Sequence, residues 1–375
     1  MINPADTAWL ITATVLVLFM TLPGLGLFYA GLVQAKNILS VLMHCIAVAC
    51  LVSVLWFAWG YSLAFSGSGA YLGDWSQSFL ANMTRTGVRE GGSIPETVFC
   101  LFQMTFAIIT PALIIGAFAE RVKFSALMVF TAIWLTVCYI PIAHMVWSGP
   151  GSLLGDMGVL DFAGGTVVHI NAGIAGLVAC LMMGKRKGYM TTAMPPHNMT
   201  YTIMGAALLW VGWFGFNVMS AQTLDKVSGL VALNSLMAMV GGTLAALVVG
   251  KNDPGFVHNG PLAGLVAVCA GSDIMHPIGS LAVGAAAGFI FVTMFTLTQN
   301  RWRIDDVLGV WPLHGLCGAW GGVAAGIFGS KALGGLGGVS FMAQLVGTVL
   351  GILVALVGGL LIYSMLKSTV GLRLD

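Results

Sequence analysis

Charged residues are scarce in this sequence. Asp, Glu, Lys and Arg make up 7% of its 375 residues and hydrophobic residues 58%, whereas a soluble domain carries about 25% charged residues. This composition excludes an ordinary soluble globular protein and predicts an all-α membrane protein whose main partner is the lipid bilayer. The formal net charge is only +2 and no basic run is present, so nothing favours a nucleic acid partner.

Paired cysteine motifs are also missing. The seven cysteines are scattered through apolar stretches, and no two of them have CxxC spacing. An odd, scattered set indicates small packing residues rather than disulfides or metal ligands. Glycine is abundant instead, with 51 residues, and its position inside apolar segments favours close packing between membrane helices.

Long apolar runs recur along the chain with the length that a membrane-crossing helix needs, about 20 residues. On this criterion we predict eleven spans. They lie at 9–33, 38–65, 95–118, 124–147, 163–184, 200–219, 228–250, 257–271, 277–298, 310–329 and 340–366. The segment 257–271 is short and rich in glycine.

The distribution of Lys and Arg predicts the orientation of these spans, because cytoplasmic loops carry an excess of positive residues. With the N-terminus outside, only Arg85, Arg89, Lys226 and Lys331 lie on the outer side, and the rest of the 15 Lys and Arg residues lie inside. The opposite topology would invert the rule. We therefore expect the N-terminus outside and the C-terminus inside.

Two histidines share one local pattern inside apolar stretches. His169 and His314 lie about 145 residues apart, and each has a glycine five residues before it and at four and seven residues after it. The pattern indicates a five-plus-five inverted repeat, with halves at about 6–184 and 198–329 and an extra helix at about 340–370. In such repeats, equivalent residues meet near the middle of the membrane.

The histidines are open to three interpretations. A single intramembrane histidine is more often structural, but two at repeat-equivalent positions favour a functional pair. A zinc site would need three or four ligands, and His144 could supply a third, yet no HxxxH or HxH spacing is present. A proton relay needs only two imidazoles, because each ring donates from one nitrogen and accepts at the other. We expect no metal, no cofactor and no enzymatic activity.

Other candidate residues lie toward the outer surface. Asp161 suits an N-cap of the fifth span, and its carboxylate would also favour a cation at the outer mouth. Phe106, Trp147, the aromatic segment 212–217 and Ser220 could belong to an interfacial aromatic belt. The same set could instead bind a cation, through aromatic faces and one hydroxyl acceptor.

Several sequence blocks, in order along the chain, resemble ammonium transporters of the Amt/Mep/Rh family, on the Amt side. The most specific is Tyr-Ile-Pro-Ile-Ala-His-Met-Val-Trp at 139–147. The others are 23–32 (PGLGLFYAGL) with Lys36-Asn37, 116–121 (GAFAER), 161–171, 212–217, Asp305-Asp306 and His314-Gly315. The resemblance runs from about residue 6 to Arg373.

The resemblance implies one Amt-type transmembrane domain over 1–375. It also implies a homotrimer of eleven-helix subunits in the cell (inner) membrane, each subunit with its own narrow pore for ammonium and for methylammonium. An ion in such a pore would be deprotonated at the outer site. Neutral ammonia would then cross, and the histidines would relay the proton separately.

Residue roles carry over by position. The resemblance implies an outer ammonium site formed by Phe106, Trp147 and Ser220. It implies that Phe106 and Phe216 stack as a gate beneath that site. Below the gate, Trp213 would line the pore beside the paired histidines His169 and His314. Asp161 would be the buried carboxylate that supports recruitment and deprotonation.

The sequence departs from the family pattern at the cytoplasmic mouth. Asp305-Asp306 is followed by Val307-Leu308-Gly309, where many relatives have an acidic residue, and Trp311-Pro312 stands where a Phe-Gly pair is common. The chain also ends where relatives usually begin a cytosolic tail. We expect that tail, which contacts PII-type regulators or fused signalling domains, to be absent or removed.

Two rival functions remain open on these residues. An Amt-type ammonium sensor would keep the same outer site and pass a signal to an output domain after residue 375. An intramembrane metalloenzyme would use His144, His169 and His314 as ligands.

Overall fold

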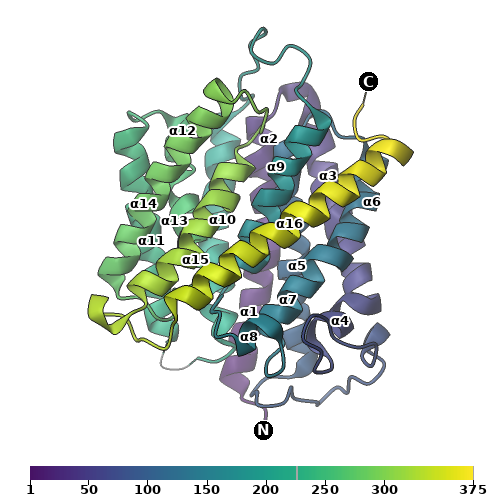
Figure 1. The fold of residues 1–375 in the computed structure, drawn as a ribbon, viewed down its shortest axis with the longest axis vertical. Coiled ribbons are helices and arrows are strands. Elements are labelled where there is room, and N and C mark those ends of the chain that lie inside the picture. Colours follow the sequence, from purple (N-terminus) through teal and green to yellow (C-terminus); the bar gives the residue numbers. More distant parts are fainter. Residues whose placement is uncertain (225–226, 375) are drawn as a thin grey trace.

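A computed structural model describes residues 1–224 and 227–374, and every regular element in these ranges is a helix (Figure 1). Lys226, counted above among the outer cations, and Asp375 lie outside the described residues. The two ends of the chain lie at opposite ends of the molecule in Figure 1. In keeping with the predicted orientation, we name the end that carries the N-terminus the outer end and the opposite end the inner end.

Nine helices of the described chain are long and apolar enough to cross a membrane, and they match nine of the predicted spans. They are α1–η1–α2 (Pro4–Leu32), η2–α3–η3–α4 (Ala35–Phe65), α5 (Glu96–Phe118), α6–η5–α7 (Phe124–Trp147), η6–α9 (Gly165–Met183), α10–η7 (Met199–Ala221), α11 (Ser228–Val249), α14–η8 (Pro277–Arg301) and α16 (Phe341–Thr369). The short α8 (Leu153–Asp156) lies at the outer end.

The other two predicted spans are also helical, but they are shorter or less apolar. Segment 257–271 contains the end of α12 (Pro254–Val257) and all of α13 (Gly260–Val268), and segment 310–329 contains η9 (Trp311–Leu316) and α15 (Cys317–Phe328). Every residue of α13 is buried inside the protein. A helix surrounded by protein needs no continuous apolar surface against lipid. The total of eleven spans therefore stays a prediction.

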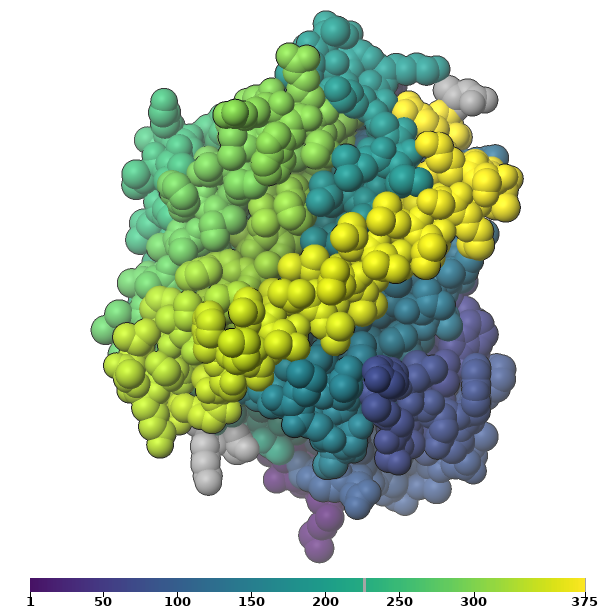
Figure 2. All heavy atoms as spheres, in the orientation of Figure 1, coloured from purple at the N-terminus to yellow at the C-terminus, as the bar shows by residue number. Residues whose placement is uncertain are grey.

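Helices begin where the sequence supplies N-caps. The side chain of Asn3 accepts hydrogen bonds from the first amides of α1, and Pro4 occupies the first helical position. Asn198 and Ser340 cap α10 and α16 in the same way. These side chains satisfy amides that have no partner within the helix. α16, 29 residues long, runs obliquely across one face of the molecule (Figure 2).

The two histidine segments are built alike. Asp161 and Asp306 each lie eight residues before a histidine, and each accepts hydrogen bonds from two amides at the start of the helix that follows. Gly164 and Gly309 both have positive φ, 98° and 72°, which favours glycine. The backbone before each helix also donates hydrogen bonds to carbonyl oxygens at the end of a different helix. These oxygens lie just after α13 in one half and in the last turn of α5 in the other. This shared construction supports an internal repeat.

The histidine helices cross at two glycines. A Cβ atom built on Gly173, four residues after His169, would collide with the backbone of Gly315. The backbones can approach this closely because Gly173 has no side chain. The crossing therefore holds the segment after His169 against the residue that follows His314.

We expect Gly173→Ala to destabilise the protein by about 1–3 kcal/mol, the usual cost of overpacking a filled site. Gly229→Ala is the matched control, because a Cβ at that helical position in α11 would meet no atom within 4 Å. The measurement is the Tm of each purified variant in the same detergent. Equal Tm values for the two variants would contradict the close crossing.

Candidate functional site

The structure brings His169 of η6 and His314 of η9 together. Their Nδ1 atoms lie 3.0 Å apart and their ring planes differ by only 10°. The exposed fractions are 2% and 4%, so both imidazoles are enclosed by protein. A nitrogen–nitrogen contact of this length is a hydrogen bond that holds one proton, with one ring donating and the other accepting.

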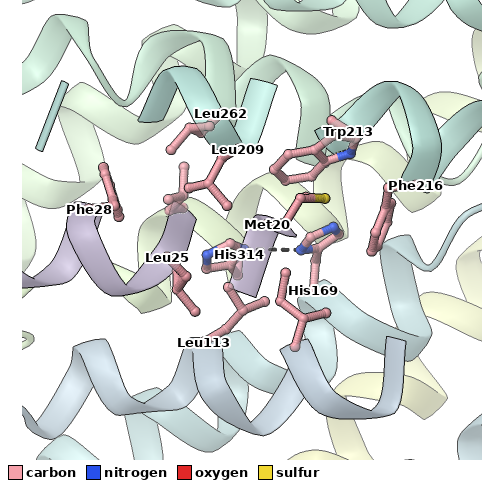
Figure 3. A pocket seen from close by; sticks show the side chains of 12 residues that line it. Met20, Leu25, Phe28, Leu113, His169, Leu209, Trp213, Phe216, Leu262 and His314 are labelled. Atoms are coloured by element: carbon pink, nitrogen blue, oxygen red, sulfur yellow. Dashed lines mark hydrogen bonds between the residues drawn. The ribbon is translucent and has the colours of Figure 1, made fainter. Parts of the chain in front are cut away.

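The histidine pair lies in a narrow apolar lumen (Figure 3). The cavity around the two rings has a volume of about 10 Å³, at the lower limit of the space that one water molecule needs. Apart from the histidines, its walls are hydrophobic. They consist of Met20, Leu25, Phe28, Ile109, Leu113, Leu209, Trp213, Phe216, Leu262 and Leu313. In Figure 3 the rings of Phe216, His169 and His314 follow one another toward Leu25 and Phe28.

Two stacked phenylalanines close the outer end of this lumen. The rings of Phe106 and Phe216 are 4.1 Å apart between centroids and 21° from parallel, and both are fully buried. Phe216 also lies against His169, at 5.9 Å between ring centroids. The stack therefore separates the histidines from the cavity on the other side of Phe106.

That outer cavity has a volume of about 60 Å³. Its walls are Phe65, Gln103, Phe106, Trp147, Phe162, Ser220 and Gln222. The Trp147 ring stands at 88° to that of Phe106, and its indole N–H donates to the backbone oxygen of Asp161 at 2.7 Å. The Ser220 hydroxyl donates to the Phe216 oxygen at 2.8 Å. Its proton is thereby used, and the Ser220 oxygen remains an acceptor.

Known proteins similar to this chain are ammonium transporters. A family model described as Ammonium Transporter Family matches residues 8–375. The ammonium transporter of Bacillus subtilis is 41% identical over 339 residues, which cover 88% of this chain and 82% of that protein. The ammonium transporter of Aquifex aeolicus is 38% identical over 386 residues, covering 100% and 90%. The chain belongs to the ammonium transporter family.

Solved structures of this family share the fold. A structure named "Sensor Amt Protein" has a TM-score of 0.90 at 28% identity and covers 99% of this chain and 95% of that one. Candida albicans Mep2 has a TM-score of 0.91 at 30% identity, covering 100% and 87%. The protein is thus an all-helical, multi-pass member of an ammonium-transporting family. The Bacillus subtilis and Aquifex aeolicus proteins are named as transporters.

Asp161 is not among the residues that line the outer cavity. Its Oδ2 atom accepts from the amides of Thr166 and Val167 at 3.0 and 2.9 Å, so the carboxylate caps the helix that carries His169. Its link to the cavity is the hydrogen bond between its backbone oxygen and Trp147. Of the two interpretations of Asp161, the cap is what the structure shows.

Two residues at the site, Gln103 and Cys269, were not predicted from the sequence. Gln103 lines the outer cavity, and its buried Oε1 atom has no hydrogen-bond partner among the described residues. A polar amide three residues before Phe106 in an apolar span was a usable signal. Cys269 is the second. Its Sγ lies 3.5 Å from His169 Nε2, although the scattered cysteines suggested packing alone.

His144 lies apart from the histidine pair. Its ring nitrogens lie 2.9 and 2.6 Å from the backbone oxygens of Ala64 and Gly69. The three-histidine ligand set of the metalloenzyme hypothesis is therefore not assembled. Within 1–224 and 227–374, no cluster of three or more His, Cys, Asp or Glu residues is placed to hold a metal ion.

An ion cluster ties the two halves together at the inner end. The Arg186 guanidinium pairs with Glu120 and with Asp305, the latter at 2.9 Å. Arg121 donates to the Asp305 backbone oxygen at 2.7 Å. The paired aspartates of the sequence thus have different contacts, because Asp306 caps the helix that carries His314.

The cluster predicts a pH-dependent stability. Burial raises the pKa of the Glu120 carboxyl. Hydrogen bonds from Asn37, Gln34 and Arg186 outweigh burial, so the pKa lies below its ordinary value of 4.5. A depressed folded-state pKa stabilises the protein fully above the unfolded pKa, and this stabilisation is lost as the pH falls through the folded value. We expect Glu120→Gln to lower the Tm at pH 7 and the difference from wild type to shrink as the pH falls below about 4.5.

Thermal unfolding of wild type and variant across this pH range measures the effect. Glu90→Gln, at an exposed glutamate of the outer loop, is the matched control and should leave the Tm unchanged at pH 7. A gap between wild type and Glu120→Gln that stays constant down to acidic pH would contradict the role of the Glu120 charge.

Proposed function

We propose that this protein binds ammonium in the outer cavity, removes its proton, and conducts ammonia and the proton separately past His169 and His314. The observation that carries this proposal is the pair of touching imidazoles inside an apolar lumen of about 10 Å³. A lumen with these walls suits a small neutral molecule. The two rings are the groups that can hold a proton there.

The outer cavity suits recognition of a small cation that donates hydrogen bonds. The faces of Phe106 and Trp147 offer cation–π attraction, worth about 0.5–2 kcal/mol. The hydroxyl of Ser220 donates its proton to the backbone oxygen of Phe216, so the Ser220 oxygen is available as an acceptor. The unpartnered Oε1 of Gln103 is a second acceptor. Ammonium, with four N–H donors, can use both oxygens and the rings together.

Deprotonation follows from the cost of desolvation. Moving an isolated ion into an apolar medium costs tens of kcal/mol by Born solvation, far more than aromatic contacts return. An ammonium ion that gives up its proton before it passes Phe106 and Phe216 avoids that cost. The role of Asp161 in this proposal is indirect, because it holds Trp147 and the His169 helix in place.

The proton would then use the histidine pair. With 3.0 Å between the Nδ1 atoms, the shared proton can move from one ring to the other without a large displacement of either ring. Two neutral rings accept one excess proton, hold it briefly and release it. Transport of ammonia and proton along one path would make the overall process electrogenic.

The wider assembly is also part of the proposal. On the family resemblance we infer a homotrimer of eleven-span subunits in the cell (inner) membrane, with the N-terminus outside. Methylammonium is the expected second substrate. A cytosolic tail, where one is present in the full-length protein, would contact a PII-type regulator or a fused signalling domain.

Ammonium sensing is the second candidate function. The observation that favours it is the fold similarity to the structure named "Sensor Amt Protein". A sensor would bind ammonium in the same outer cavity and pass a conformational signal to an output domain. Ammonium binding without any ammonium-driven current in liposomes would favour this alternative over conduction.

The relay is tested with the double variant His169→Ala, His314→Ala. We expect it to abolish the current that follows an ammonium jump in proteoliposomes more completely than it abolishes ammonia flux, because a neutral molecule can still cross an apolar lumen. A solid-supported membrane records the current, and a pH-sensitive dye inside the liposomes reports ammonia. His276→Ala, at an exposed histidine, is the control. Wild-type current in the double variant would refute the relay.

The outer site is tested with Trp147→Leu. Loss of a cation–π contact of about 0.5–2 kcal/mol should raise the half-saturating ammonium concentration about 2- to 30-fold. Trp75→Leu is the matched control, since Trp75 lies in the outer loop and is 65% exposed. The same concentration dependence for wild type and Trp147→Leu, with unchanged exclusion of potassium, would remove Trp147 from the binding site.

A further inference from the structure

Cys269 follows the last residue of α13 and is completely buried beside the histidine pair. Its Sγ atom has several polar neighbours. Trp213 Nε1 lies at 3.3 Å, the Leu265 backbone oxygen at 3.0 Å and His169 Nε2 at 3.5 Å. The Trp213 ring also stacks on the His169 ring, 18° from parallel. The thiol is therefore in contact with the nitrogen of His169 that faces away from His314.

The position of the thiol proton follows from these neighbours. An indole nitrogen only donates, so the sulfur accepts from Trp213. The thiol has one proton to give, and the nearest acceptor is the Leu265 oxygen, with the Asn217 Oδ1 atom at 3.5 Å as the other oxygen. Both oxygens only accept. The proton of Cys269 is thus directed at an oxygen, and a sulfur lone pair is left for His169.

The orientation of the Asn217 amide is consistent with this assignment. The Ser235 hydroxyl donates to the Val231 oxygen at 2.7 Å, so its oxygen accepts from the Asn217 Nδ2 atom at 2.9 Å. The Oδ1 atom of Asn217 then points to Cys269 as an acceptor. Asn217 and Ser235 are both fully buried, which favours a single arrangement of these hydrogen bonds.

We propose that Cys269 is a positioning residue that sets the tautomers of the histidine pair. A bare Nε2 of His169 would face the sulfur lone pair without a proton between them, so Nε2 carries the proton and donates to Cys269. The Nδ1 of His169 is then bare and accepts. His314 therefore carries its proton on Nδ1 and donates across the 3.0 Å contact.

In this order of protons, only one of the two ring nitrogens that face away from the shared contact is unprotonated. The Nε2 of His314 is left bare, on the side of the ring toward Leu25 and Phe28 in Figure 3. It is then the basic nitrogen of the pair that a molecule in the lumen can reach. An excess proton taken up there passes through the Nδ1–Nδ1 contact to His169, toward the outer end. Inward passage from His169 to His314 starts from the opposite tautomers and leaves the pair in the order described here, so both rings must change tautomer before each further inward passage. The tautomers rest on geometry alone, whereas their use in transport rests on the proposed function.

Solid-state NMR of protein with ¹⁵N-labelled histidine in bilayers tests the tautomers directly, because protonated and bare ring nitrogens give separate signals. The single variants His169→Ala and His314→Ala assign the signals, since each variant lacks one set. We expect wild type to show one tautomer for each ring, with the proton on Nε2 in His169 and on Nδ1 in His314. A wild-type His169 with its proton on Nδ1 would overturn the proposal without any variant.

Cys269→Ala and Cys269→Ser separate a positioning role from packing. The alanine variant removes the acceptor, so each ring should show both tautomers in place of one. The serine variant keeps one proton and one acceptor atom, and should restore the wild-type pattern. Cys45→Ala, at another fully buried cysteine, should leave the pattern unchanged. An unaltered spectrum in Cys269→Ala, or a mixed one in Cys269→Ser, would overturn the proposal.

Current recorded from the same samples distinguishes this inference from the proposed function. The expected tautomers together with no ammonium-driven current would refute conduction and leave the role of Cys269 intact. A normal current with the opposite tautomers would refute the role of Cys269 and leave conduction intact.

Discussion

The cost of placing charge in an apolar interior is the constraint on which this structure depends. The lumen around His169 and His314 is small and lined by hydrocarbon, and at that depth an unpartnered polar group is costly. Each imidazole has the other as a partner. One carboxylate oxygen of Asp161, Oδ2, and both oxygens of Asp306 accept hydrogen bonds from helix amides. An apolar path with one histidine pair is what remains, and in the proposed function this pair carries the proton separately from the neutral molecule.

The internal repeat contains a capping aspartate, a glycine of positive φ and a histidine in each half, but the surroundings of the two aspartates differ. Asp161 and Asp306 cap equivalent helices at the same spacing from their histidines, but Asp161 also anchors Trp147 beside the outer cavity. At the inner end, the neighbouring Asp305 joins an ion cluster with Arg186. The repeated aspartate cap therefore lies next to the outer cavity in one half and next to the inner ion cluster in the other.

The limits of sequence reasoning are clear at particular residues. Long apolar runs predicted nine spans that the structure contains, because length and hydropathy are local properties. They were poorer guides at α13, where burial by neighbouring helices replaces contact with lipid. Gln103 and Cys269 were passed over because their importance lies in contacts with residues distant in the chain. Asp161 was expected both to cap a helix and to favour a cation, and only the cap is local enough to follow from its position.

The sequence by itself determined that the chain is a helical membrane protein with two equivalent histidines, since composition, periodicity and repeated spacing are written along the chain. Only the tertiary structure decided that the two rings touch, that Phe106 stacks on Phe216, and that a cysteine 100 residues from His169 contacts the ring nitrogen that faces away from His314. The physical reason is distance. Hydrogen bonds and ring stacking act over a few ångströms, and which side chains come that close depends on how helices cross, as at Gly173 and Gly315.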